Sequence, residues 1–151
     1  MADTENPSIT SVSYTDNIVT LGEEGFNLSN LPITLGLSDN LSGVATWYLH
    51  WDSPSNVDVT AANFSVGNIT SGESAPTYGT NLSSSSEQGE YTFNYVQLYD
   101  DAGNIVTIYE NDITDYGLTA EQFNFTVVGD NPSDTENPSI TSVSYTDNIV
   151  T

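Results

Sequence analysis

Residues 47–51 read Trp-Tyr-Leu-His-Trp, and this short stretch decides the fold class. The two tryptophans and the leucine alternate with the tyrosine and the histidine. In a β-strand, side chains two residues apart lie on the same face, so the three apolar groups would share one face. An apolar period of two residues recurs along most of the chain, whereas a helix needs a period near 3.6. The pattern therefore predicts an all-β chain.

The same pattern predicts about 7–9 short strands, with turn signals roughly every 8–12 residues. We expect strands at Ile9–Tyr14, Ile33–Leu37, Trp47–Trp51, Val57–Phe64, Thr77–Leu82, Tyr91–Leu98, Asn104–Tyr109 and Phe123–Val127. A helical turn is indicated only at Ile113–Gln122. Short strands with a tryptophan on the third of them are typical of an immunoglobulin-like antiparallel β-sandwich. In that fold Trp47 packs in the core, whereas Trp51, at the strand end, could be half exposed.

A repeat sets the domain organisation. The sequence DTENPSITSVSYTDNIVT occupies residues 3–20 and returns unchanged at 134–151, a period of 131 residues (134 − 3 = 131). A unit of this size is an independent domain rather than one turn of a solenoid. We therefore expect one complete domain at 3–133, followed at 134–151 by a linker and the first strand of an identical repeat. Residues 1–2 are interpreted as an expression start.

The charge of the chain excludes several classes of partner. It contains 21 Asp and Glu, one His and no Lys or Arg, for a formal charge of −21. Nucleic acids bind through cationic side chains, so they are not expected as partners. Membrane insertion is not expected either, because no apolar run approaches 18 residues. Without Lys or Arg, the carboxylates must be hydrated, hydrogen-bonded or neutralised by bound cations.

Three short motifs carry a resemblance to a known family. They are Asp39–Val44 (DNLSGV), Ser53–Ser55 (SPS) and Tyr99–Asn104 (YDDAGN). In this order they resemble immunoglobulin-like extender repeats of large, calcium-dependent bacterial surface adhesins secreted by the type I route. The resemblance spans most of one unit and implies an extracellular, cell-surface spacer. This chain lacks the basic residues that such repeats usually carry.

Acidic side chains are expected to converge at one pole of the sandwich. The loop after the second strand and the loop in Tyr99–Asn104 lie at that pole, as does the start of the first strand. Oxygen ligands without sulfur or nitrogen indicate Ca²⁺. The candidate ligands at this pole are Asp3, Glu5, Asp39, Asp100, Asp101 and Asn104. Asp39 and Asn104 could instead cap turns, with Gly43 and Gly103 supplying positive φ, and both roles can coexist.

The second copy extends this expectation to the junction between repeats. Three further candidate ligands lie there: Asp130, Asp134 and Glu136. Two prolines restrict the linker, and an ion would restrict it further. We therefore expect Ca²⁺ to stiffen an array of neighbouring identical repeats, while another domain of the parent protein binds a host or abiotic surface.

An enzyme is not expected. His50 is the only imidazole and has no Cys, Lys or motif-placed Ser beside it. The alternative function is a ligand-binding adhesin module, for glycan or ice, in which Tyr48, Trp51 and Tyr109 could form a stacking platform. Identical tandem copies are more typical of a spacer than of a ligand-binding module, which usually occurs once. The spacer is therefore the preferred prediction.

Overall fold

The structure is a computed structural model that describes residues 2–129 and 137–150. Its strands are β1 (Ser8–Tyr14), β2 (Ile18–Leu21), β3 (Phe26–Asn27), β4 (Ile33–Ser38), β5 (Val44–Asp52), β6 (Asp58–Asn63), β7 (Ser71–Ser74), β8 (Tyr78–Gly79), β9 (Asn81–Leu82), β10 (Gly89–Asp100), β11 (Ile105–Tyr109) and β12 (Phe125–Gly129). Three short 3-10 helices accompany them: η1 (Leu28–Asn30), η2 (Ile113–Tyr116) and η3 (Ala120–Phe123).

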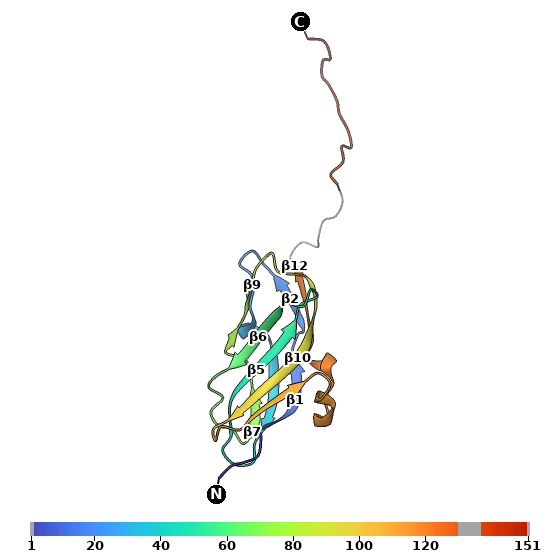
Figure 1. The fold of residues 1–151 in the computed structure, drawn as a ribbon. Helices are drawn as coiled ribbons and strands as arrows, with labels where there is room; N and C mark the ends of the chain where they lie inside the picture. Colours follow the sequence, from blue (N-terminus) through green and yellow to red (C-terminus); the bar gives the residue numbers. More distant parts are fainter. Residues whose placement is uncertain (1, 130–136, 151) are drawn as a thin grey trace.

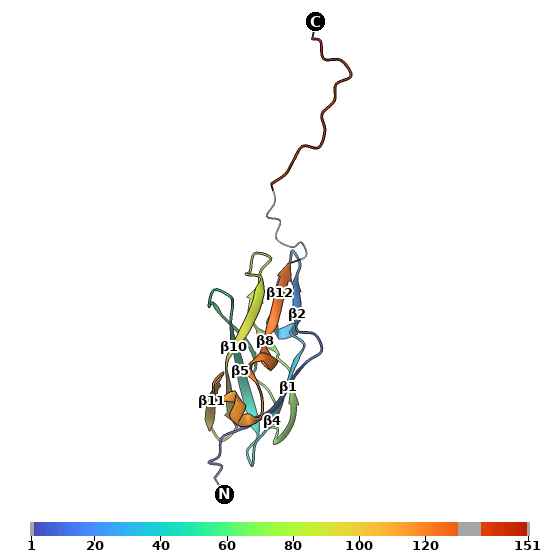
Figure 2. The same cartoon turned by 90° about the vertical axis from the view of Figure 1, so that its right-hand side faces the viewer.

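The predicted all-β sandwich is confirmed. One sheet has the order β1-β4-β7, and the larger sheet has the order β2-β12-β10-β5-β6-β8, with β11 also paired to β10. Figures 1 and 2 show these layers facing each other in an elongated body. All pairings are antiparallel except the one between β2 and β12. The twelve strands exceed the expected number because three of them, β3, β8 and β9, are only two residues long.

The alternating sequence explains the core. Leu35 and Leu37 on β4 face Trp47 and Leu49 on β5, and all four side chains are buried. The 3-10 helices η2 and η3, which occupy the predicted helical turn, lie between β11 and β12 and cover one side of this core.

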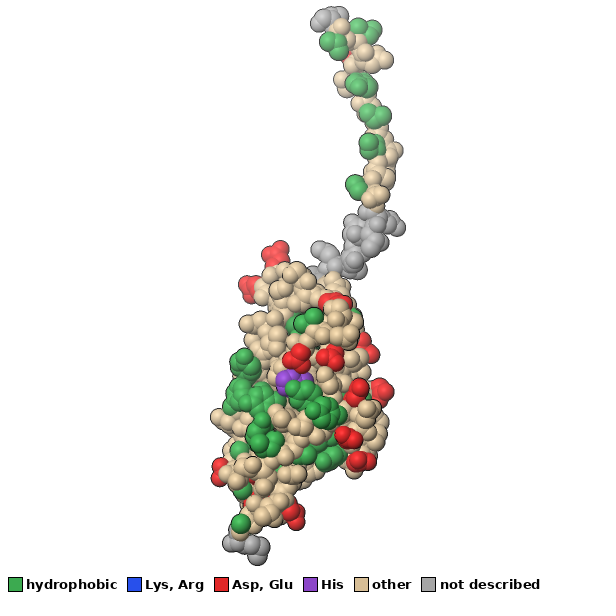
Figure 3. All heavy atoms as spheres, in the orientation of Figure 1, with side chains coloured by type: hydrophobic (Ala, Val, Ile, Leu, Met, Phe, Trp, Pro, Cys, Tyr) green, Lys and Arg blue, Asp and Glu red, His purple; other side chains and the backbone are tan. Residues whose placement is uncertain are grey.

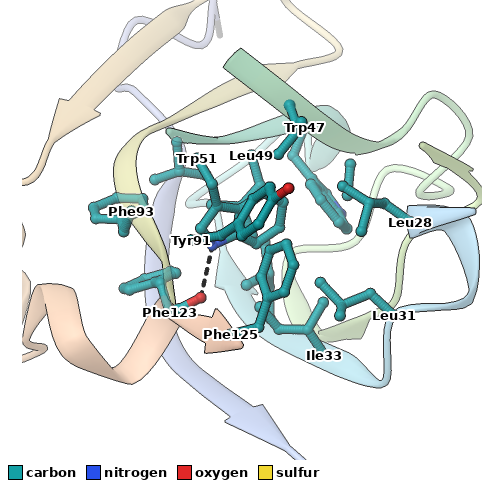
Figure 4. Packing of buried hydrophobic residues seen from close by; sticks show 14 of the residues in the cluster. Leu28, Leu31, Ile33, Trp47, Leu49, Trp51, Tyr91, Phe93, Phe123 and Phe125 are labelled. Atoms are coloured by element: carbon teal, nitrogen blue, oxygen red, sulfur yellow. Dashed lines mark hydrogen bonds between the residues drawn. The ribbon is translucent and has the colours of Figure 1, made fainter. Parts of the chain in front are cut away.

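Trp51 belongs to the core, which corrects the expectation that it could be half exposed. Its side chain is 0% exposed, and its indole Nε1–H donates to the Phe123 carbonyl oxygen at 2.7 Å (Figure 4). Phe123 is the last residue of η3, and its ring stacks on Phe93 with centroids 4.2 Å apart. The end of β5 is therefore covered by the segment that follows β11.

The two ends of the domain lie at opposite poles. The chain enters at one end of the body, while β12 runs toward the other end (Figure 1). The last residue of β2, Leu21, pairs with Gly129 at the end of β12, so the Gly22–Gly25 turn lies beside the point where β12 ends. The start of the domain and the end of its last strand are therefore separated by the length of the body.

Residues 137–150 form no strand, although the same sequence forms β1 and the first two residues of β2 in its first copy. The first copy is held by pairing with β4 and β12, and a strand needs such a partner to be stable. The expected domain boundary near 133 falls outside the described residues. None of the helices in the described ranges has the length and apolar character needed to cross a membrane.

Candidate metal centre

The loop between β4 and β5 is built around Asp39. Its carboxylate oxygen Oδ2 accepts hydrogen bonds from the backbone N–H groups of Leu41 (3.3 Å) and Gly43 (2.7 Å). Gly43 has φ +88°, and a Cβ there would lie 2.1 Å from the Asn68 carbonyl oxygen. Only glycine fits this position, because it allows both the positive φ and the close approach. The expected turn-capping role of Asp39 is therefore present.

The loop between β10 and β11 is built in a similar way around Asp100. Its Oδ1 accepts from the backbone N–H of Asn104 and its Oδ2 from the Asn104 side-chain amide, both at 2.7 Å. Gly103 has φ +97°, as expected. The backbone N–H of Asp101 donates to the Gly43 carbonyl oxygen at 3.0 Å, so the two loops are joined directly.

The leading segment, residues 2–7, lies against both loops. Asp3 Oδ2 accepts from the backbone N–H of Ser42 (2.9 Å) and from its hydroxyl (2.6 Å). The Asn104 side-chain amide donates to the Asp3 carbonyl oxygen at 3.2 Å. The hydrogen bonds from Ser42 hold the pKa of the Asp3 carboxyl below its ordinary value of 3.8. The carboxylate is therefore fixed in its charged form at this pole.

These contacts bring three carboxylates together in what we call the Asp triad: Asp3, Asp39 and Asp100. One oxygen from each lies within 4.8 Å of the others. Asp39 and Asp100 are buried, with 9% and 5% of their surface exposed. Asp39 Oδ1 is a buried oxygen with no hydrogen-bond partner among the described residues.

The donor set of the Asp triad fits a hard divalent cation. Carboxylate oxygens suit Ca²⁺ and Mg²⁺, whereas zinc sites are usually built from His and Cys. The only basic side chain of the protein, His50, contacts Asp58 instead, at 3.1 Å. The chain thus offers no positive side chain of its own to the triad. The unpartnered Asp39 oxygen is the specific feature that an ion would satisfy.

The structure does not gather every predicted ligand. The side chains of Glu5 and Asp101 are exposed, and neither belongs to the triad. Asn104 lies at the site, but through its amide N–H, which donates to Asp100 and Asp3. Asp130, Asp134 and Glu136 lie outside the described residues.

Sequence analysis missed the roles of two serine motifs. Ser42, inside the DNLSGV motif, anchors the leading segment through Asp3. The SPS motif binds Glu87, whose Oε2 accepts from the hydroxyl of Ser53 (3.0 Å) and from the hydroxyl (2.6 Å) and backbone N–H (3.0 Å) of Ser55. The Ser55 hydroxyl is the main cause that lowers the pKa of Glu87. Serines beside a turn are the signal that could have indicated these contacts.

The expected stacking platform is wrong in one member, because Trp51 is buried in the core and cannot contact a ligand. Tyr48 is half-buried on the outer face of the larger sheet, and Tyr109 is 51% exposed. His50 lies on the same face, stacked on Tyr95 with ring centroids 4.2 Å apart.

Comparison with known proteins yields a likeness of fold. No protein-family model and no curated protein sequence matches the chain. Among solved structures, Cwp6 from Clostridium difficile is similar, with a TM-score of 0.51 and 10% sequence identity over 90% of this chain. The chain spans 19% of the length of that protein, so the likeness concerns one part of it. At this identity the similarity shows a shared β-sandwich fold alone.

Proposed function

We propose that this chain is a non-catalytic, immunoglobulin-like spacer module of an extracellular bacterial surface protein, and that Ca²⁺ bound by the Asp triad stiffens an array of such modules. Three features support the spacer role: the sequence of residues 3–20 returns unchanged at 134–151, the repeating unit has the size of a domain, and the start of the domain and the end of β12 lie at opposite poles. The fold shared with a protein from Clostridium difficile supports a bacterial origin. Contact with a host or abiotic surface would fall to another domain of the parent protein.

The observation that carries the metal proposal is the unpartnered, buried oxygen of Asp39 inside a group of three carboxylates. Burying an unpaired polar oxygen is unfavourable, and three negative charges at this separation repel one another. A divalent cation would remove both costs at once. Ca²⁺ takes 6–8 oxygen ligands, so water and neighbouring oxygens would complete the coordination.

The position of the triad gives the ion a mechanical role. Asp3 lies in the leading segment, which precedes β1, while Asp39 and Asp100 belong to the body of the sandwich. An ion shared among the three would hold the leading segment against its own domain. In an array the leading segment of each module is the linker that follows the preceding one, and residues 134–138 repeat residues 3–7 of that segment unchanged. Fixing that segment removes conformations from the junction.

Thermal unfolding in EDTA and in increasing Ca²⁺ tests the site. Extracellular calcium modules bind with Kd of about 10⁻⁴–10⁻³ M, and binding at 100 times Kd stabilises by about 2.7 kcal/mol. We expect the Tm to begin to rise at about 10⁻⁴–10⁻³ M Ca²⁺ and then to climb with the logarithm of the Ca²⁺ concentration. Asp39→Asn should abolish the rise. Asp101→Asn removes the same charge from the neighbouring loop, but Asp101 lies outside the triad. This variant should therefore still show the Ca²⁺-dependent rise in Tm.

Two outcomes would count against the site. Sodium at equal ionic strength could stabilise as much as calcium, which would mean that the acidic surface is only screened. Alternatively, both variants could respond alike, which would mean that no specific ligand set exists. The array role is tested separately by small-angle X-ray scattering of a chain with two consecutive modules. Ca²⁺ should lengthen and narrow its distance distribution, and an unchanged distribution would contradict stiffening.

A further inference from the structure

The outer face of the larger sheet carries two groups of aromatic side chains, which together we call the aromatic face. Its members come from β5, β6–β7, β8, β10 and β11: Tyr48, Phe64, Tyr78, Tyr95, Tyr99 and Tyr109. Phe64, Tyr78 and Tyr109 are 47%, 56% and 51% exposed. In Figure 3 hydrophobic side chains gather on this face beside the histidine. Three large aromatic side chains exposed together on a strongly charged chain indicate an interaction site.

The register explains why the rings meet. Tyr95 pairs with His50 on β5 and with Tyr109 on β11, and Tyr48 pairs with Ala62 on β6, which in turn pairs with Tyr78. Alternation along each strand sends the intervening apolar residues into the core. Most of the face is therefore a direct product of strand pairing, and Phe64, the first residue after β6, completes it.

Carboxylates border the aromatic face. Asp52 and Asp58 pair directly across β5 and β6, an unfavourable arrangement of like charges. The Asn94 amide donates to Asp52, and His50 contacts Asp58. Glu110 follows Tyr109 at the other side of the face. Burial raises the pKa of the Tyr95 hydroxyl, and the nearby Asp58 and Asp52 carboxylates raise it further. The negative charge of Asp52 and Asp58 therefore reaches the Tyr95 ring.

His50 shows how a planar nitrogen-bearing group lies on this face. Its ring stacks on Tyr95 at an interplanar angle of 18°, while its Nδ1 contacts Asp58 Oδ1 at 3.1 Å. An arginine guanidinium prefers the same two partners, an aromatic ring on its face and a carboxylate at its edge. Arg also desolvates more readily than Lys in such contacts.

Other occupants fit less well. A second copy of this chain would bring Asp52, Asp58 and Glu110 against their equivalents with no Lys or Arg to separate them. A sugar chain lying across a flat platform needs rings in a common plane. The row Tyr78, Phe64, Tyr48 and Tyr99 is instead tilted by 55°, 72° and 63° from ring to ring.

We propose that the aromatic face is a docking surface for an arginine-rich segment of a different protein. Guanidinium groups would lie on the tyrosine rings, and Asp52 and Asp58 would accept their N–H groups. Because the chain contains no Lys or Arg, a basic segment that binds this face must come from a different protein. For the same reason, two identical modules would repel each other if they met through this face. This inference is independent of calcium binding, because the face does not include the Asp triad.

The test measures fluorescence anisotropy of labelled octa-arginine and octa-lysine with the full chain, at about 0.15 M salt. We expect octa-arginine to bind about tenfold tighter than octa-lysine. The triple variant Phe64→Ser/Tyr78→Ser/Tyr109→Ser should weaken octa-arginine about tenfold. The control Ile18→Ser removes an apolar group of similar exposure elsewhere and should change nothing.

A second pair of variants tests the carboxylates. Asp52→Asn/Asp58→Asn should weaken octa-arginine more than Glu23→Gln/Glu24→Gln, which removes the same charge from an exposed turn. Equal affinity for the two peptides, or equal loss in the two charge variants, would show general attraction to an acidic chain and overturn the proposal. Retention on a neutral polysaccharide gel, or concentration-dependent dimers lost in the triple variant, would assign the face to a glycan or to a second copy and would overturn it too.

Discussion

Asp3 and Ser42 are joined by two hydrogen bonds, one from the Ser42 backbone N–H and one from its hydroxyl, both to the same carboxylate oxygen. Through this pair the leading segment is bound to the loop between β4 and β5. Both partners belong to the protein itself, so the pair positions Asp3 beside Asp39 and Asp100. Removing the Ser42 hydroxyl should therefore affect both the pH dependence of stability and the calcium affinity.

The first prediction concerns pH. The pKa of Asp3 is lowered on folding, so the folded state favours the charged carboxylate. Its contribution is fully present above the ordinary value of 3.8 and is lost as pH falls through the lower folded value. Ser42→Ala should have a lower Tm than wild type at neutral pH. In strong acid, where Asp3 is protonated, the difference in Tm between wild type and variant should become smaller. An equal gap at both pH values, in EDTA, would contradict this role.

The second prediction concerns Phe123, whose carbonyl oxygen accepts from both Tyr14 Oη–H and Trp51 Nε1–H, each at 2.7 Å. Tyr14→Phe leaves one donor and should cost about 1 kcal/mol. Trp51→Phe leaves the other donor but adds a cavity. The double variant leaves the buried carbonyl unpaired, so urea unfolding should show a loss larger than the sum of the two single losses. Simple additivity would contradict the shared-acceptor arrangement.

The third prediction compares two glycines of the metal-centre loops. Gly43 and Gly103 both have positive φ, but a Cβ at Gly43 would meet the Asn68 carbonyl oxygen at 2.1 Å, whereas a Cβ at Gly103 would meet nothing within 4 Å. Gly103→Ala should cost about 1 kcal/mol from backbone strain alone. Gly43→Ala should cost about 3 kcal/mol or more and weaken calcium binding, because the loop must move. Similar losses in urea unfolding would contradict the close approach.

The fold was predictable where apolar residues alternate over several positions, as in β4 and β5. The strands β2, β3 and β7 were not predicted. Each is four residues or shorter, and β7 reads Ser-Gly-Glu-Ser, so its pairing with β4 comes from tertiary context instead of composition. The burial of Trp51 was missed for a related reason. The groups that cover it come from η3, which is distant in sequence.

At the candidate site, sequence reasoning placed Asp3, Asp39 and Asp100 at one pole from loop topology, and the structure brings them together. It could not separate Asp100 from Asp101. Neighbouring residues in a tight turn point in different directions, and here Asp100 caps the turn while Asp101 faces solvent. Which of the two side chains faces the triad depends on the backbone geometry of the turn, which sequence patterns did not reveal.

The most direct test is the position of the ion itself, by anomalous diffraction from crystals grown in millimolar Ca²⁺. We predict a calcium peak about 2.3–2.6 Å from oxygens of Asp3, Asp39 and Asp100. The Asp39 oxygen that has no protein partner should be among its ligands. A map with no anomalous peak at the triad, or with a water molecule alone bound to that oxygen, would contradict the account.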